Sequence, residues 1–293
     1  MIEIKNLRKN FGDKVALNVE NIVIPSGNIF ALFGVNGSGK STLLRVISGV
    51  YDADEGSITY DNANLLEPLS RKEFLYISDD PLSKGQTLDT LFSFYSTFYG
   101  LTKENYEKYL KLFAINLKDR RLSRYSKGMR RRVYLAIALA VSPKVLILDE
   151  AFDGLDIVGK TIFKDQILKA VEEDCSKTVI IASHSIKEVS DFIDKFVILS
   201  KGEVVYDSEK NESVDCLRIE VGFKDAFDVI NLEKDGFKIF RSSKKTATLL
   251  TSMPKDDAIA VLNRYNPALI DVEEANVEEL FYFKSEENFN ELF

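Results

Sequence analysis

The segment Gly34–Ser41 constrains the fold of this chain more than any other feature, because it reads Gly-Val-Asn-Gly-Ser-Gly-Lys-Ser. The apolar run Ile29–Phe33 precedes it, and apolar residues at helical spacing follow it from Leu43 to Ile47. A glycine-rich turn between a buried strand and a helix lets backbone N–H groups wrap around a phosphate at the helix N-terminus. Average residue usage gives such a match by chance in roughly 1% of chains of this length. The segment therefore predicts a phosphate-binding loop (P-loop) in an α/β fold.

The residue types within this loop suit a nucleotide with bound Mg²⁺. The ammonium of Lys40 would neutralise the β- and γ-phosphates, the hydroxyl of Ser41 would ligate Mg²⁺, and Thr42 would lie near the α-phosphate. The other nucleotide-binding residues that the motif implies form the cradle itself: Gly34, Asn36, Gly37, Ser38 and Gly39.

A second candidate element is Lys144-Val-Leu-Ile-Leu-Asp149-Glu150, an apolar run that ends in two carboxylates. A carboxylate at the carboxyl end of a buried strand can hold the Mg²⁺ shell, which suits Asp149. Glu150 follows directly and is a candidate to accept a proton from the attacking water. Many strands end in Asp-Glu for structural reasons, but the pairing with the P-loop indicates a nucleotide hydrolase.

The spacing of apolar runs predicts a central, mainly parallel sheet. Ile29–Phe33, Lys144–Leu148 and Thr178–Ala182 are short and continuous, as in strands that are buried on both faces. The residues before Ile29 alternate like antiparallel strands, and 72–135 is rich in helical patterns. We therefore expect residues 1–210 to form an α/β nucleotide-binding domain with a central parallel sheet, an antiparallel β subdomain and a helical subdomain at 72–135.

The helical region carries an aromatic stripe whose members recur at roughly i, i+3, i+4 and i+7: Leu91, Phe92, Phe94, Tyr95, Phe98 and Tyr99. Most such stripes are the core face of a helix. The alternative is that part of the stripe lines a groove for a helix of a partner protein.

Residues 211–293 have the pattern of a separate α+β accessory domain. A strand at 217–223, a helix at 225–232, a hairpin at 237–251, a helix at 254–265 and a strand at 268–272 follow one another. This β-α-β-β-α-β order is that of a ferredoxin-like unit. A closing helix would start at Asn276, with Glu279 completing a capping box.

Three further segments resemble one family, the ATP-binding cassette (ABC) ATPases. Tyr125-Ser-Lys-Gly-Met129 precedes a helix and is similar to the LSGGQ signature of that family. Gly154-Leu-Asp156 resembles its D-loop, and Ser183-His184 at the end of an apolar strand resembles its H-loop. The motifs occur in the family's order and spacing, and the resemblance covers about residues 1–208.

The resemblance implies ATP as the nucleotide and a role for each matching residue. Phe11 would stack on the adenine, and His184 would hold the γ-phosphate and the attacking water. The signature residues Ser126, Lys127 and Gly128 would face the ATP bound by the opposite subunit. Asp156 would lie at the interface of two cassettes, which are either two copies of this chain or a copy and a paralogue.

The chain departs from the family pattern in two places. The family has Gln after the strand at Leu75–Ser78, where this chain has Asp79, and Gln86 stands several residues too far along to replace it. A carboxylate can meet Mg²⁺ but donates no hydrogen bond to water or phosphate. In the signature, Lys127 replaces a glycine, and it would either add positive charge near the phosphate or point to solvent.

The charge distribution bears on possible partners. Residues 211–293 hold 10 Lys and Arg against 17 Asp and Glu, which accounts for the whole net charge of −7. A basic cluster lies beside the signature: Arg120, Arg121, Arg124, Lys127, Arg130, Arg131 and Arg132. It is a solvated face, a phosphate contact or a site for acidic groups of a partner. No nucleic acid is expected, because the chain has neither a tandem cassette nor a coiled-coil insertion.

The expected function is that of an ATPase that drives a separate membrane permease, which would dock near 72–125. The longest apolar run, Val133–Val141, is about half of what a bilayer requires, so the expected location is the cytoplasm, at the inner face of the membrane. Two cysteines form no disulfide framework, which agrees with a reducing compartment.

The accessory domain resembles tails of ATPase subunits that are paired with separately encoded export permeases, and this resemblance favours export over import. The alternatives are a non-transport cassette acting in translation or DNA repair, and a simple P-loop kinase, which leaves the signature unexplained.

Overall fold

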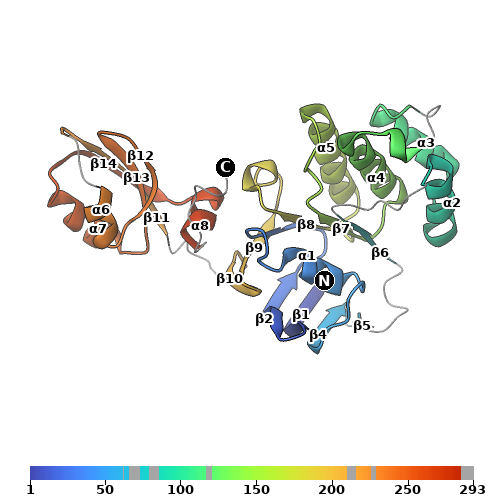
Figure 1. The fold of residues 1–293 in the computed structure, drawn as a ribbon, viewed down its shortest axis with the longest axis horizontal. Coiled ribbons are helices and arrows are strands. Elements are labelled where there is room, and N and C mark those ends of the chain that lie inside the picture. The colour runs from blue at the N-terminus through green and yellow to red at the C-terminus, as the bar shows by residue number, and fades with distance from the viewer. Residues whose placement is uncertain are drawn as a thin grey trace. The chain divides into compact units, whose positions relative to one another are not determined.

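The computed structural model describes residues 1–61, 63–65, 73–78, 86–116, 121–209, 216–225 and 229–284 (Figure 1). The chain forms two compact units, Met1–Val204 and Val205–Phe293.

A six-stranded sheet organises the first unit. Its order is β10-β9-β3-β8-β7-β6, from β3 (Ile29–Phe33), β6 (Phe74–Ile77), β7 (Val145–Asp149), β8 (Thr178–Ser183), β9 (Lys195–Ser200) and β10 (Glu203–Asp207). The pairs β3–β8, β3–β9, β7–β8 and β6–β7 are parallel. Every residue of β3, β7 and β8 is buried. The mainly parallel sheet predicted from the apolar runs is thus confirmed.

A four-stranded antiparallel sheet forms the second layer of this unit. Its order is β2-β1-β4-β5, from β1 (Ile2–Phe11), β2 (Lys14–Ile24), β4 (Glu55–Tyr60) and β5 (Ala63–Asn64). Helix α1 (Lys40–Ile47) lies between the two sheets (Figure 1). Leu43, Leu44, Val46 and Ile47 join the apolar side chains of both sheets in one core. This core fixes the start of α1, where the P-loop ends.

The helical part consists of α2 (Leu88–Tyr99), α3 (Lys103–Leu112), the short helix η1 (Leu122–Arg124), α4 (Lys127–Val141) and α5 (Ile157–Glu173). Figure 1 shows α2 to α5 grouped on the side of the six-stranded sheet away from β1 and β2. Helix α4 is buried from Val133 to Ala140, because the apolar run there packs among its neighbours. The helix therefore continues past residue 135, where the sequence placed the end of the helical region. A short helix, η2 (Ile186–Glu188), follows β8.

The second unit has the topology predicted from its pattern. Its elements are β11 (Leu217–Phe223), α6 (Val229–Lys234), β12 (Lys238–Ser242), β13 (Thr246–Thr251), α7 (Lys255–Asn263), β14 (Pro267–Glu274) and α8 (Val277–Lys284). The strand order β12-β13-β11-β14 with antiparallel neighbours is that of a ferredoxin-like unit. Leu232 of α6 and Leu262 of α7 share one core with Ile219 and Val221 of β11.

Helix α8 begins with the predicted capping box. The backbone N–H of Asn276 donates to Glu279 Oε2 at 2.9 Å, and the N–H of Glu279 donates to Asn276 Oδ1 at 3.0 Å. Two N–H groups at the helix start are thereby satisfied by side chains.

Candidate nucleotide-binding site

A cavity of about 560 Å³ lies where β3 and β7 end and α1 begins. Ligands of open α/β sheets bind at the carboxyl ends of the strands, which is where this cavity lies. Its lining residues are Phe11, Lys14, Val15, Ala16, Asn36, Gly37, Gly39, Lys40, Ser41, Thr42, Arg45, Asp149, Glu150 and Lys201. The structure thus brings Phe11, the P-loop and the Asp149-Glu150 pair around one space.

The P-loop backbone is shaped so that two of its glycines cannot carry a side chain. A Cβ on Gly34 would lie 2.3 Å from Ser38 Oγ and 2.6 Å from the carbonyl oxygen of Leu199. Gly39 has a φ of +107°, and its Cβ would lie 2.9 Å from a methyl of Leu17. Ser38 is 2% exposed, and its buried hydroxyl has no hydrogen-bond partner within the described residues. A loop with this tight backbone and an unpaired hydroxyl fits a bound phosphate.

Lys40 holds its charge inside this loop. Its Nζ donates to the carbonyl oxygens of Gly34 at 2.6 Å and Val35 at 3.1 Å, and lies 3.7 Å from Glu150 Oε1. The side chain is 5% exposed, and burial lowers its pKa, while the charges of Glu150 and Asp149 oppose that shift. A buried ammonium with two nearby carboxylates is well placed to neutralise phosphate charge.

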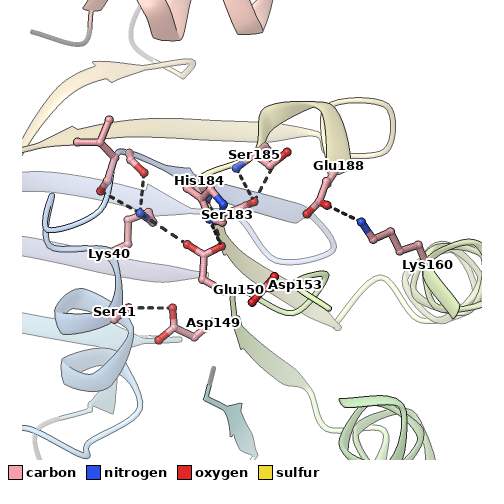
Figure 2. Close-up of polar contacts among 12 residues, drawn as sticks. Lys40, Ser41, Asp149, Glu150, Asp153, Lys160, Ser183, His184, Ser185 and Glu188 are labelled. Atoms are coloured by element: carbon pink, nitrogen blue, oxygen red, sulfur yellow. Dashed lines mark hydrogen bonds and ion pairs between the residues drawn. The ribbon is translucent and has the colours of Figure 1, made fainter. Parts of the chain in front are cut away.

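Ser41 and Asp149 form an oxygen pair beside Lys40 (Figure 2). The hydroxyl of Ser41 donates to Asp149 Oδ1 at 2.9 Å, and Tyr76 OH donates to Asp149 Oδ2 at 3.0 Å. The carboxylate of Asp149 is fully buried at the end of β7. Burial and the neighbouring Asp149 charge raise the pKa of Tyr76, so its hydroxyl keeps its proton and remains a donor.

These oxygens fit Mg²⁺ in the way that this ion is bound in nucleotide enzymes. Mg²⁺ takes oxygen ligands in octahedral geometry, and protein usually supplies one or two of them while substrate phosphates and water supply the rest. The described part of the chain holds no cluster of three or more His, Cys, Asp or Glu that could bind a metal alone. With one or two oxygens as the usual share of the protein, Ser41 and Asp149 would hold the ion together with the nucleotide.

Glu150 and His184 meet at the edge of the cavity. His184 Nδ1 lies 2.8 Å from Glu150 Oε2, and the His184 N–H donates to the same oxygen at 3.3 Å. Glu150 has a φ of +50°, and its N–H donates to the carbonyl oxygen of Ala182 in β8 at 3.0 Å. This sharp turn after β7 directs the carboxylate toward both Lys40 and the end of β8 (Figure 2).

Phe11 also lines the cavity and lies at the end of β1. Its side chain is 47% exposed, and its ring makes an edge-to-face contact with Tyr51 at a centroid distance of 5.4 Å. Since Phe11 is outside the core, its ring has an open surface on which a base can stack.

The signature residues lie elsewhere on the cassette. Ser126 caps α4 by accepting from the N–H of Met129 at 3.2 Å, and Lys127 Nζ lies 2.5 Å from Asp153 Oδ2. Asp156 caps α5 through the N–H of Gly159 at 2.9 Å and forms an ion pair with Arg132. None of the residues 125–129, all of which the structure describes, lines the cavity.

Some of the sequence-predicted features have a structural role or lie outside the described residues. Arg131 is 2% exposed and donates to the carbonyl oxygen of Ser78 at 2.9 Å, so it belongs to the packing of α4. Gln86 accepts a hydrogen bond from Tyr134 OH in α4. Asp79 and Arg120 lie outside the described residues. Tyr76 was not anticipated, because only the pairing of β6 with β7 brings it to Asp149.

The fold and the cavity define a P-loop ATPase, and comparison with known proteins places it in a family. A family model described as ABC transporter matches residues 17–153. The chain is 31% identical over 214 residues to the lantibiotic transport ATP-binding protein SrtF of Streptococcus pyogenes, covering 73% of this chain and 93% of that protein. It is 29% identical over 238 residues to the ABC transporter ATP-binding protein NatA of Bacillus subtilis, covering 74% and 96%. The chain belongs to the ATP-binding subunits of ABC transporters.

Solved structures agree with this family. The structure of an ATP binding subunit of an ABC transporter superposes with a TM-score of 0.65 and 27% identity, covering 71% of this chain and 89% of that one. The ATP-binding cassette MJ0796, as a dimer in a post-hydrolysis state bound to ADP and Pi, superposes with a TM-score of 0.62 and 26% identity, covering 71% and 98%. Within the described residues, no helix has both the length and the apolar character needed to cross a bilayer.

Proposed function

We propose that two cassettes close around two ATP molecules and that this closure drives a separate membrane permease for export. The observation that carries the dimer is the position of the signature. The cavity is lined by the P-loop and the ends of β1 and β7, but by no residue from 125–129. If Ser126 contacts ATP, it therefore does so from a second cassette, which is either another copy or a paralogue.

The residues of the cavity have complementary chemical tasks in this proposal. The ring of Phe11 stacks on adenine, the cradle from Gly34 to Thr42 binds the phosphates, and Lys40 neutralises their charge. Mg²⁺, held by Ser41 and Asp149 with the nucleotide, would polarise the transferred phosphoryl group. Glu150 accepts the proton of the attacking water, and His184 orients that water and the γ-phosphate.

The contribution of the second cassette follows from its signature and its D-loop. Ser126 and Gly128 face the γ-phosphate at the opposite site, and Asp156 lies at the interface. Two large apolar side chains support an interface beside Asp156, since Ile157 and Val158 are 82% and 62% exposed. A ligand that contacts both halves stabilises the closed state, and hydrolysis removes that bridge.

An exposed aromatic pair on α2 supports the docking of a permease near 72–125. Leu91 and Tyr95 of the aromatic stripe are buried, whereas Phe94 and Phe98 are 50% and 69% exposed. The rings of Phe94 and Phe98 lie 4.8 Å apart by their centroids and form one apolar surface. An apolar surface of this kind suits insertion of a partner's helix, and the cassette would then sit on the inner face of the membrane.

Purification from membranes tests this proposal. The tagged chain should recover a polytopic membrane protein, and replacing Phe94 and Phe98 by Ser should abolish that recovery. Leu269→Ser, at a side chain that is 64% exposed in the second unit, is the matched control and should leave recovery intact. Recovery of ribosomes or DNA instead would favour the alternative, a non-transport cassette of translation or DNA repair.

Export can be tested on the same complex. Reconstituted into vesicles with the recovered permease, the ATPase should move its cargo away from the side on which ATP is hydrolysed. Movement toward that side would make the protein an import ATPase.

A further inference from the structure

Lys127, the residue that replaces a signature glycine, is bound to the loop that follows β7. Its Nζ lies 2.5 Å from Asp153 Oδ2, although both side chains are about half exposed, at 59% and 46%. The ammonium of Lys127 holds the pKa of the Asp153 carboxyl below its usual range. The sequence left two placements open for Lys127, beside a phosphate or in solvent, and the contact that the structure describes is with Asp153.

The backbones behind this ion pair are also in contact. A Cβ on Gly128 would lie 2.5 Å from the carbonyl oxygen of Gly154, so only glycine fits at 128. A Cβ on Gly154 would lie 3.7 to 3.9 Å from the methylene groups of Lys127, whose stem therefore passes beside that glycine. The start of α4 and the turn at 153–154 form one packed contact.

A second ion pair holds the far end of the same loop. Arg132 of α4 pairs with Asp156, whose other oxygen accepts from the N–H of Gly159. Lys127 and Arg132 are five residues apart, or about 7.5 Å along the helix. The loop is thus held to α4 at both ends.

The held loop leads directly to Glu150. The N–H of Asp153 donates to the carbonyl oxygen of Glu150 at 3.2 Å, and the Glu150 carboxylate contacts His184 at 2.8 Å. Contacts therefore run without a break from Lys127 through Asp153 to Glu150. In the dimer, Ser126, the residue before Lys127, would serve the partner's ATP, whereas Glu150 would serve the chain's own ATP.

We propose that the Lys127–Asp153 pair is a latch that couples the signature segment to the loop carrying Glu150, so that ATP at one site of the dimer controls hydrolysis at the other. This inference rests on the proposed function. The latch makes Lys127 and Asp153 positioning residues, which act on the reaction through Glu150. A single exposed ion pair adds little to stability, so its effect lies in the coupling of the two segments.

Charge reversal and its rescue test the latch. ATP hydrolysis is measured against ATP concentration for the wild type, Lys127→Glu, Asp153→Lys and the double variant. Each single variant should lower kcat by about 2- to 5-fold, from the usual strength of an exposed pair, and should bring the Hill coefficient toward one. The double variant should restore both values, whereas ATP binding to the P-loop should stay unchanged throughout.

A matched control comes from a second exposed ion pair, which lies where β6 and β7 begin. Lys144 Nζ lies 2.8 Å from Glu73 Oε1, with side chains 51% and 43% exposed, remote from the cavity lining. Lys144→Glu and Glu73→Lys should leave kcat and the Hill coefficient unchanged. Unchanged kinetics in Lys127→Glu, a double variant as impaired as the singles, or stimulation by Asp153→Lys would each overturn the latch.

Amide hydrogen exchange separates the latch from the proposed function. Exchange at residues 151–156 should be faster in Lys127→Glu than in the wild type, and slow again in the double variant. Equal exchange in all three proteins would overturn the latch. If the wild type hydrolysed no ATP while exchange followed this pattern, the proposed function would fail and the contact would stand.

Discussion

The carboxylate of Glu150 lies between two cationic or potentially cationic groups, with Oε2 2.8 Å from His184 Nδ1 and Oε1 3.7 Å from Lys40 Nζ. Asp149, one residue earlier, is fully buried and hydrogen-bonded to Ser41 and Tyr76. Adjacent carboxylates thus face different partners. Asp149 suits the Mg²⁺ shell, whereas Glu150 faces the cavity, where it can accept a proton.

Glu150→Gln should abolish turnover while leaving ATP binding intact. The amide keeps the shape of the side chain but cannot accept the proton, and loss of a general base costs about 10²- to 10⁴-fold in rate. The variant should accumulate as an ATP-bound dimer, measured by light scattering with and without ATP. Glu172→Gln, at an exposed position of α5, is the control. Normal turnover in Glu150→Gln would remove Glu150 from its proposed role.

Ser41→Ala should raise the Mg²⁺ concentration needed for half-maximal activity. The variant removes the proposed oxygen ligand and the hydrogen bond that orients Asp149 Oδ1. Loss of such an orienting contact lowers metal affinity by about 10- to 100-fold. Ser48→Ala, in which the lost hydroxyl donates to the carbonyl oxygen of Arg45, should not change the Mg²⁺ dependence. An identical Mg²⁺ titration for Ser41→Ala and the wild type would contradict the metal assignment.

Asp79→Gln should restore the residue type that the family has at this position. ATP binding should persist, whereas coupling to the permease or the preference for Mg²⁺ over Mn²⁺ should change, since an amide donates a hydrogen bond and carries no charge. Hydrolysis with each metal, with and without the permease, measures both effects. If neither differs from the wild type, Asp79 has no special role.

Glu279→Gln should loosen the contact between α8 and the sheet of the second unit without affecting ATP hydrolysis. Glu279 is 4% exposed, and its Oε1 accepts from Arg218 Nε at 2.9 Å while Oε2 caps the helix. Losing a charged hydrogen bond from a buried group costs about 1 to 3 kcal/mol. Thermal unfolding should show the loss, and Glu274→Gln, at an exposed carboxylate nearby, should show none. Equal melting of both variants would mean that the Arg218 contact adds no stability.

Much of the fold could be predicted from the sequence because short-range patterns determine it. Short runs of apolar residues predict the buried strands β3, β7 and β8. The glycines of the P-loop likewise determine the shape of a turn only a few residues long. The antiparallel strand β2 shows where such patterns mislead. The buried positions Val19 and Ile22 are three residues apart and therefore break the alternation expected of one continuous strand. The structure has one strand, because its partner β1 is irregular at the same place. Leu7 pairs with Val19 and Ile4 pairs with Ile22, and Asn6 between them has a φ of +49°.

The candidate site was predictable only where a motif carries its chemistry. The P-loop is one contiguous motif, Asp149 and Glu150 belong to a second, and the structure brings the two motifs together at the cavity. Tyr76 is 73 residues from Asp149, and Lys127 is 26 residues from Asp153. Contacts of this kind depend on how strands pair and how a helix start meets a loop. No local pattern in one sequence encodes them.

The two cysteines should differ sharply in reactivity, although neither is part of the site. Cys175 is exposed, whereas Cys216 is buried in the second unit. Burial raises the pKa of the Cys216 thiol to about 12. The thiolate is the reactive form, so at pH 8 the raised pKa keeps Cys216 almost entirely in its unreactive thiol form.

Alkylation with iodoacetamide at pH 8, followed by mass spectrometry, should modify Cys175 in the folded protein and leave Cys216 untouched. In guanidinium chloride both should react, because unfolding removes the burial that raises the pKa of Cys216. Cys175→Ser should therefore make the folded chain unreactive. Labelling of Cys216 in the folded chain as fast as in the unfolded chain would show that the contact between α8 and the sheet opens readily, since Ala275 and Cys216 are joined by a backbone hydrogen bond just before α8.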